Sequence, residues 1–319
     1  MSKIDARDGP KFKAPITSAP GEMTISEIWN AKKHLPVIVR LLNEEYRSSY
    51  EFIPFNEERV LSQIRKRNLE IFVSEANGKL LGLIATHEEN LEEHILWLAA
   101  WRGQNRRTIE NMLVKEIEKK VKGATISIMV DEGSPKISDW INRGYTLQPG
   151  FQRMSASLNS LKPIPQTAKD VKFRSLKPEE EEKLIAIVNT GFGWQRLGPG
   201  VLEKWKSEDP PFSEDWVQVA EVGETFVSAV VAKPDTDCIK YLHLKRGYLG
   251  PAATLPELRN RHLASALTAR AMNFLFEEGM SSVRLATSEQ NGSSIALLRN
   301  LGFHVDVVRK VLRKKLRSA

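Results

Sequence analysis

The residues with the clearest chemical potential lie between 248 and 267, where the sequence reads YLGPAATLPELRNRHLASAL. This apolar stretch, punctuated by Gly and Pro, predicts a buried strand with a local break, which Pro256 ends before a helix that begins near Leu258. The first N–H groups of a helix lack intrahelical partners and carry partial positive charge. Because Arg259 and Arg261 add full charges beside them, this junction is predicted to bind an anion such as phosphate.

The junction resembles the acyl-CoA-binding segment of the GNAT (Gcn5-related N-acetyltransferase) family, which reads Arg or Gln, two residues, Gly, one residue, then Gly or Ala. Arg259 fills the first position and Ala264 the last. His262 stands where the family has its middle glycine, and Asn260 replaces another common glycine. In the family the glycine lets backbone amides close on the cofactor pyrophosphate, so a side chain there is expected to crowd it. An amphipathic helix with two basic residues in its first turn is the alternative interpretation.

A second segment supports the resemblance. The sequence NGSSIALLRNLGF, from Asn291 onward, resembles the family segment in which an Asn opens a short helix and a Gly-Phe pair begins the next strand. The spacing from Asn291 to Gly302 suits about three helical turns, with Ile295 and Leu298 on one face.

The resemblance implies that acetyl-CoA is the cofactor. Amides near the strand end are expected to hold the acyl and pantetheine groups, those at the helix start the pyrophosphate, and the Asn the cofactor arm. The predicted cofactor-binding residues are Ala253, Thr254, Leu255, Arg259, Asn260, Arg261, His262, Leu263, Ala264, Ser265, Asn291 and Ser294.

Proton transfer has fewer candidate residues. Acyl transfer to an amine needs a group that takes a proton from the nucleophile and a donor toward the developing oxyanion. Tyr248, Glu221 and His243 are predicted on strands that border the cleft, and they are the candidate catalytic residues. Family members frequently place a Tyr acid seven residues after the Asn, but this sequence has Leu298, which cannot donate. A thiolate can still leave, because thiols are already fairly acidic.

Aromatic residues gather at the start of the second half, at Phe192, Trp194 and Trp205. They fall in the two helices that form the acceptor side in members of the family. Core packing is the favoured interpretation, and an aromatic-lined pocket for a non-polar or cationic amine is the alternative.

The elements that must position these residues occur twice. The sequence EANGKLLG at 75–82 corresponds to EVGETFVS at 221–228, each an acidic strand end, a turn and an apolar strand. Gly144-Tyr145 likewise mirrors Gly302-Phe303. The fold class is therefore predicted as α+β, with two tandem GNAT folds, each a mostly antiparallel mixed sheet flanked by helices.

Four segments are predicted along the chain. Residues 1–22 form a disordered leader, 23–160 a degenerate GNAT-like domain, 161–170 a Pro-containing linker, and 171–319 the domain that carries the signature. In tandem GNAT proteins one copy often loses catalysis, and the first copy here lacks the signature glycines.

The first copy has three arginines near its counterpart helix, Arg102, Arg106 and Arg107. The helix dipole disfavours basic residues in the first turn, so an anion or a carboxylate neighbour is expected. Solvated arginines are preferred over a phosphate site.

Composition bounds the remaining possibilities. The 319 residues suit two domains, and the formal charge of +7 favours anionic partners. The basic residues from Arg309 to Arg317 predict an edge strand or tail, and nucleic acid is not expected because stacking aromatics are missing there. With Cys238 the only cysteine and six scattered His, no metal site is predicted. No apolar run spans a bilayer and no secretory signal is present, so a cytoplasmic protein is expected.

Two functions stay open. The leading hypothesis is an acetyl-CoA-dependent N-acyltransferase, of the class that transfers groups other than aminoacyl groups, acting on an amine of a small molecule or protein. The alternative is a catalytically silent CoA-binding or regulatory protein, suggested by His262 and Leu298. A monomer and a homodimer both remain open.

Overall fold

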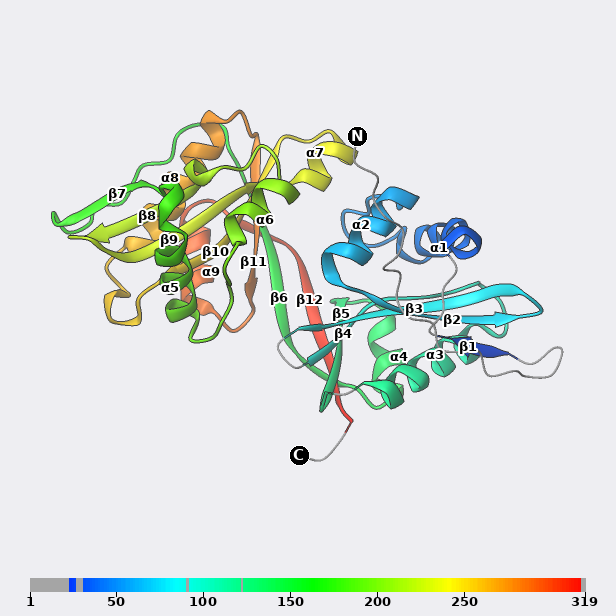
Figure 1. The fold of residues 1–319 in the computed structure, drawn as a ribbon. Coiled ribbons are helices and arrows are strands. Elements are labelled where there is room, and N and C mark those ends of the chain that lie inside the picture. Colours follow the sequence, from blue (N-terminus) through cyan, green and yellow to red (C-terminus); the bar gives the residue numbers. More distant parts are fainter. Residues whose placement is uncertain (1–22, 27–30, 90–91, 122, 317–319) are drawn as a thin grey trace. The chain divides into compact units, whose positions relative to one another are not determined.

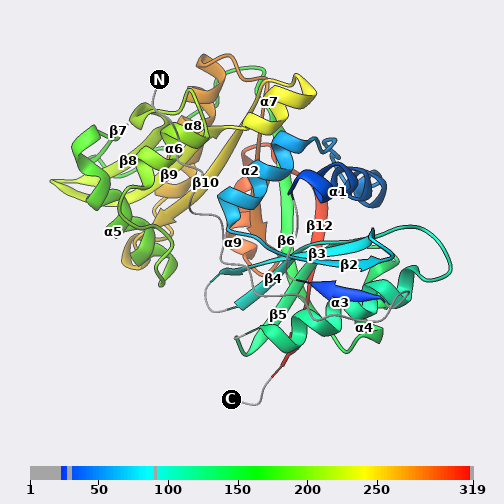
Figure 2. The same cartoon turned by 45° about the vertical axis from the view of Figure 1, so that its right-hand side comes forward.

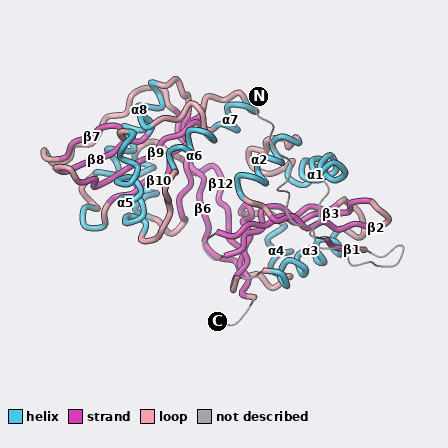
Figure 3. Tube along the Cα trace, viewed as in Figure 1, coloured by secondary structure: helices cyan, strands magenta, loops and turns pink. Residues whose placement is uncertain are grey.

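A computed structural model describes residues 23–26, 31–89, 92–121 and 123–316. The predicted leader, residues 1–22, lies outside the described residues. The chain forms two compact units, one made of residues 1–148 and 310–319 and the other of residues 149–309. Figure 3 distinguishes the helices from the strands in both units.

The first unit has a twisted sheet with helices on both faces. Its elements are β1 (Thr24–Ser26), α1 (Ala31–Tyr46), α2 (Glu57–Arg67), β2 (Glu70–Ala76), β3 (Lys79–Glu89), β4 (Glu92–Ala100), α3 (Arg106–Lys120), β5 (Thr125–Asp131) and α4 (Lys136–Asn142). The strands follow the order β1-β2-β3-β4-β5, antiparallel except for the parallel pair β4 and β5. Helices α1 and α2 cover one face, and α3 and α4 the other (Figures 1 and 2).

Strand periodicity explains the two faces of this sheet. In β2, Ile71 and Val73 pack with Leu41 of α1, whereas Phe72 packs with Leu113 of α3. Successive side chains of a strand point to opposite faces, so one apolar run supplies both cores.

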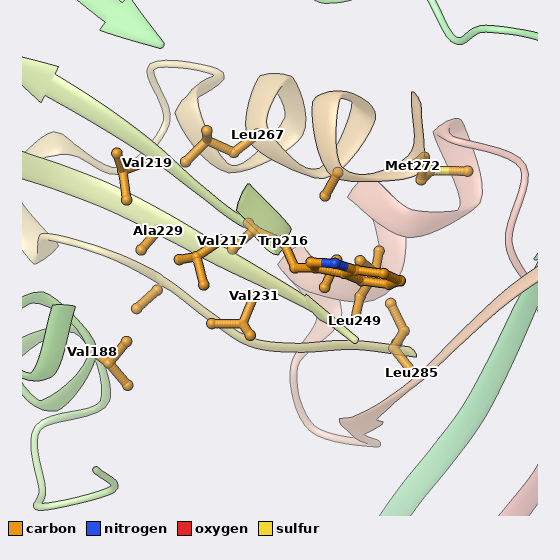
Figure 4. Close-up of a cluster of buried hydrophobic side chains, with 14 of the residues drawn as sticks. Val188, Trp216, Val217, Val219, Ala229, Val231, Leu249, Leu267, Met272 and Leu285 are labelled. Atoms are coloured by element: carbon orange, nitrogen blue, oxygen red, sulfur yellow. The ribbon is translucent and has the colours of Figure 1, made fainter. Parts of the chain in front are cut away.

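The second unit repeats this arrangement. Its elements are β7 (Val171–Ser175), η1 (Pro178–Glu180), α5 (Glu181–Phe192), α6 (Val201–Glu208), η2 (Glu214–Trp216), β8 (Val217–Val222), β9 (Thr225–Pro234), α7 (Thr236–Leu242), β10 (Arg246–Thr254), η3 (Pro256–Leu258), α8 (Leu263–Glu277), β11 (Ser282–Ser288) and α9 (Gly292–Asn300). Figure 4 shows Val188 of α5 on one side of the strands and Leu267 and Met272 of α8 on the other. All three are buried in one core cluster. The α+β fold class is therefore confirmed.

Two element predictions were wrong in this unit. The pattern of residues 240–255 predicts one strand, but residues 240–242 end helix α7 and only Arg246–Thr254 form β10. The helix expected at 258–278 begins at Leu263, after the short η3 turn and a four-residue connection.

Each unit is completed by a strand from the other half of the sequence. Strand β6 (Thr146–Ser157), encoded by the first half, pairs antiparallel with β11 from Phe151 to Ser157. Strand β12 (His304–Lys315), encoded at the C-terminus, follows β5 in the strand order and then precedes β6. The units therefore divide at residues 148/149 and 309/310, and not within the predicted linker at 161–170.

The basic C-terminal residues are not on an edge strand or in a tail, as the sequence had suggested. Arg313 makes a bidentate pair with Glu92, with Nε–Oε1 at 2.6 Å and Nη2–Oε2 at 2.7 Å. Lys314 donates to Glu118 at 2.8 Å. Leu312, which directly precedes these two cations on the strand, is fully buried. Period-two alternation had indicated a strand, but the pattern does not show which neighbours it has.

In the part of the chain that the structure describes, no helix has both the length and the apolar composition of a membrane span. Within the same part of the chain, no group of three or more His, Cys, Asp or Glu side chains is placed to hold a metal ion.

The first prediction concerns the exchanged strand. Leu312→Ala should lower the free energy of unfolding by about 2–5 kcal/mol, because it leaves a cavity in the core of the first unit. Hydrogen exchange should rise in β4 and β5. The control Leu161→Ala, at a side chain that is 55% exposed, should change stability by no more than about 0.5 kcal/mol. An equal effect of both variants would contradict the placement of β12.

Candidate functional site

The central feature of the second unit is the point where β10 separates from β11. The two parallel strands stay in register only from Arg246 to Tyr248, opposite Ser282 to Arg284. After that point β10 continues along β9, with a register shift between Leu249 and Ala252, while β11 continues along β6. The predicted strand break is therefore present, and it leaves one side of β10 without a partner strand from Leu249 onward.

The direction of the amides along β10 follows from its pairing with β9. Leu255 donates its N–H to the Val227 carbonyl at 3.0 Å, so this amide is not available to a ligand, contrary to prediction. In an antiparallel pair the N–H direction alternates, so Ala253 also faces β9 and Ala252 and Thr254 face away from it. No described side chain caps these two amides. The sequence had included Ala253 and missed Ala252, because the register decides which amides point outward.

The first unit has the same strand separation, but there it is closed. Strand β4 pairs with β5 only from Glu93 to Ile95. Trp101 donates its N–H to Leu81, as Leu255 does to Val227, which makes Leu98 the counterpart of Ala252. The Leu98 N–H is bound by the hydroxyl of Tyr46 at 3.1 Å. The first copy thus fills with its own side chain the position that the second copy leaves open.

The start of α8 supplies a second set of unpaired amides. The first intrahelical bond runs from Ala266 N–H to the His262 carbonyl at 2.9 Å, so Leu263, Ala264 and Ser265 have no intrahelical acceptor. The His262 side chain does not cap them. The side chains of Asn260, Arg261 and His262 are all exposed.

His262 and Asn260 occupy backbone conformations that favour glycine. Their φ angles are 60° and 63°. The two residues therefore differ from the family glycines, while the backbone has a conformation that favours glycine. Each left-handed non-glycine residue costs about 1–2 kcal/mol. The imidazole is exposed, so it does not fill the helix start from within.

Arg259 links this segment to the end of α5. Its guanidinium donates to the Gly191 carbonyl at 2.8 Å. A Cβ at Gly191 would lie only 2.8 Å from Cβ of Ala253 and 3.3 Å from the Thr254 nitrogen, so glycine is required for this approach. One guanidinium nitrogen of Arg259 is therefore bound within the protein although the side chain is exposed, and Arg261 is a second exposed cation at the helix start.

The remaining predicted cofactor residues open helix α9. Asn291 Oδ1 accepts from the Ser294 N–H at 3.1 Å, which makes Asn291 the N-cap of the helix. Its contact with the cofactor arm stays a prediction. Leu298 is only 6% exposed and belongs to the hydrophobic core. This position contributes neither a proton donor nor a polar atom.

For two of the three candidate catalytic residues, the structure does not support a role in proton transfer. Glu221 accepts from Arg174, with Nη2–Oε2 at 2.8 Å, and the same guanidinium also binds Glu180. His243 lies in the exposed C-cap of α7, with φ 55°, and not on a strand as predicted. Tyr248 alone of the three lies where β10 leaves β11.

The arginines of the first copy have carboxylate neighbours. Arg106 pairs with Glu45 and, at 2.8 Å, with Glu110, and Arg107 pairs with Asp139. The helix start that corresponds to α8 is thus neutralised by the protein's own acidic residues. Arg106 is thus held in ion pairs and half-buried, whereas Arg102 and Arg107 are exposed, as the solvated interpretation predicts.

The comparisons with known proteins agree with this division. The Acetyltransferase (GNAT) family matches residues 177–303. The match covers less than half of the chain. No curated protein sequence matches the chain. The match lies in the second unit, where amides of β10 and of the start of α8 are unpaired. It does not extend to the first unit, where side chains bind the corresponding groups.

Solved structures extend the likeness in fold to both units. A GCN5-related N-acetyltransferase from Sphaerobacter thermophilus has a TM-score of 0.71 at 16% identity, covering 95% of this chain and 98% of that one. A tandem GNAT protein from the clavulanic acid biosynthesis pathway has a TM-score of 0.67 at 14% identity, covering 93% and 100%. A glucosamine N-acetyltransferase region of a fungal multi-domain protein reaches 0.71 at 13%, covering 93% of this chain and 38% of that one. The chain has a tandem GNAT fold.

The second prediction concerns the left-handed residue at the helix start. His262→Gly should leave the free energy of unfolding unchanged or raise it by up to about 1 kcal/mol, because glycine adopts this conformation without strain. His262→Val should lower it by about 1–2 kcal/mol, since a β-branched residue is poorest at positive φ. Urea denaturation measures both. A glycine variant less stable than the valine variant would contradict this conformation.

The third prediction concerns the ion pairs of Arg174, which binds both Glu221 and Glu180. Hydrogen bonding from Arg174 lowers the pKa of Glu180 to about 2, from an ordinary value of 4.5. Because the folded-state pKa is depressed, the stabilisation is complete above pH 4.5 and is lost as the pH falls through about 2. Glu180→Gln should remove roughly 3 kcal/mol of this pH-dependent stability.

Unfolding free energies measured at several pH values between 5 and 2 test this expectation. The exposed Glu182 is a matched control, and Glu182→Gln should keep the wild-type pH dependence. If Glu180→Gln and the wild type lose the same free energy on acidification, the assigned pair does not stabilise the fold.

Proposed function

We propose that the second unit is an N-acyltransferase that uses acetyl-CoA as the acyl donor and an amine as the acceptor. The observation that carries this proposal is the coincidence of two sets of unpaired amides. One set lies on the free side of β10, at Ala252 and Thr254, and the other at the uncapped start of α8.

The residues present fit the donor. A pyrophosphate needs N–H groups and positive charge, and the amides of Leu263, Ala264 and Ser265 lie beside the exposed Arg261. A pantetheine arm carries amide groups, which can pair with the outward amides of β10 as an added strand would. When bound, acetyl-CoA supplies an activated acyl group.

The geometry also orders these sites along the strand. The helix start follows the C-terminal end of β10, and the separation from β11 begins six residues before that end, at Tyr248. Six residues of extended chain span roughly 20 Å. A donor with its phosphates at α8 would therefore direct its acyl end toward Leu249 and Gly250. Outward amides there would stabilise negative charge that develops on the acyl oxygen.

The alternative is a protein that binds CoA without turnover. The burial of Leu298 in the core favours it, because the usual acid of the family is missing. Thiol release over a panel of amines separates the two functions: binding without release on any amine would support the silent protein.

The fourth prediction tests the phosphate site. Arg261→Glu should weaken acetyl-CoA binding at least about 30-fold, because it removes a charge-assisted contact and places an anion near the phosphates. The control Arg299→Glu reverses an exposed charge near the end of α9 and should change the Kd less than about twofold. Calorimetry measures binding, and thermal unfolding confirms that both variants are folded. Unchanged affinity of Arg261→Glu would count against the assigned site.

A further inference from the structure

The proposed reaction releases a thiolate, and the residue that usually protonates it in the family is absent here. Leu298 occupies that position and is buried. A replacement must be a titratable side chain at the point where β10 leaves β11, because the acyl end is directed there. We infer that Tyr248 is this proton donor, an inference that rests on the proposed function.

Tyr248 stands at the apex of the strand separation. It is the last residue of β10 in register with β11, opposite Arg284, and it also pairs with Lys233 of β9. Its side chain lies on the face of the sheet that α5 and α6 cover. This follows from Lys233, its cross-strand partner, whose ammonium group lies 4.0 Å from the ring centroid of Trp205 in α6.

The ring extends along the strand toward the unpaired segment. A Cβ at Gly250 would lie 3.4 Å from Cε1 of Tyr248 and 3.7 Å from its hydroxyl oxygen. The phenol therefore covers the position that a side chain at residue 250 would take. Gly250 has φ 141°, a conformation that also favours glycine. The hydroxyl consequently reaches the first residues of β10 that lack a partner strand.

The hydroxyl of Tyr248 is available for this role. No described group hydrogen-bonds to it, and the side chain is half-buried. Two other tyrosine hydroxyls are not available in this way, because one is bound and the other is buried. The Tyr46 hydroxyl binds the Leu98 amide at 3.1 Å, and Tyr145 is buried in the core of the first unit, where burial raises its pKa.

Positive charge flanks the phenol on both neighbouring strands. Lys233 lies on one side, held by Asp209 at 3.2 Å, and Arg284 lies on the other, with its Nε 2.9 Å from Asp235. Both cations are ion-paired with carboxylates, and their positions beside Tyr248 follow from the strand register. The other candidates lack this placement, because Glu221 is bound by Arg174 and His243 is in an exposed cap.

The step balances without a further reactant. The amine nitrogen forms a bond to the acyl carbon, the carbon–sulfur bond breaks, and its electron pair goes to sulfur. Tyr248 gives its hydroxyl proton to that sulfur, and the proton lost by the nitrogen returns to the phenolate through solvent. The products are the amide and the free thiol.

The activity test compares Tyr248→Phe with Tyr241→Phe, a control at a half-buried tyrosine of α7. Tyr248→Phe should lower kcat about 100-fold or more, with the Kd of acetyl-CoA changed less than about twofold, because only proton transfer is lost. Tyr241→Phe should retain the wild-type kcat. Wild-type kcat in Tyr248→Phe would overturn this inference and leave the proposed function standing. A wild-type protein that releases no thiol with any amine would overturn both.

A binding test needs no turnover. Calorimetry with CoA and with desulfo-CoA, which lacks the sulfur, reports the contact between the thiol and the hydroxyl. In the wild type CoA should bind about two- to tenfold more tightly than desulfo-CoA, and in Tyr248→Phe the two should bind equally. An unchanged ratio in the variant would show that the hydroxyl does not reach the sulfur.

Discussion

The proposed function depends on backbone hydrogen bonds that β10 does not make. A strand within a sheet normally satisfies its N–H and C=O groups on both sides, and unpaired buried groups are costly. Beyond Tyr248 one side of β10 has no partner strand, while β9 still holds the other side in register. The position of β10 is thus fixed by β9, while the N–H and C=O groups on its other side have no partner strand. The first unit shows the other solution, in which the Tyr46 hydroxyl satisfies the corresponding amide of Leu98.

The comparison of the two units gives a physical basis for the difference between the copy that carries the signature and the degenerate copy. Both units separate the same pair of strands, so the sheet geometry alone does not distinguish them. They differ in what occupies the opening. In the first unit the Tyr46 hydroxyl binds the amide in the opening and carboxylates pair with Arg106 at the helix start, whereas the second unit has unpaired amides and the exposed Arg261. The proposed binding site is thus absent from the first unit, although the same pair of strands separates in both.

The sequence predicted the class of fold and the break in the strand before Pro256 well, because those depend on local patterns. Strand alternation, the Asn77-Gly78 turn, with φ 50° and 69°, and the Asn291 cap are all encoded within a few residues. Register is different. Whether the Leu255 amide faces β9 or the opening depends on a bulge and on a partner strand some thirty residues away. Leu298 was recognised as unable to donate, but its burial and the approach of Tyr248 to Gly250 are tertiary facts.

The exchange of β6 and β12 also bears on how this protein is divided for study. A fragment ending near residue 160 would lack β12, and β5 would present a row of unpaired N–H and C=O groups to solvent. A fragment beginning near residue 171 would lack β6, the antiparallel neighbour of β11. The predicted linker is therefore a poor place to cut, although it has the composition of one. Fragments made there are expected to associate through their missing strands, so the halves are better suited to complementation than to separate expression.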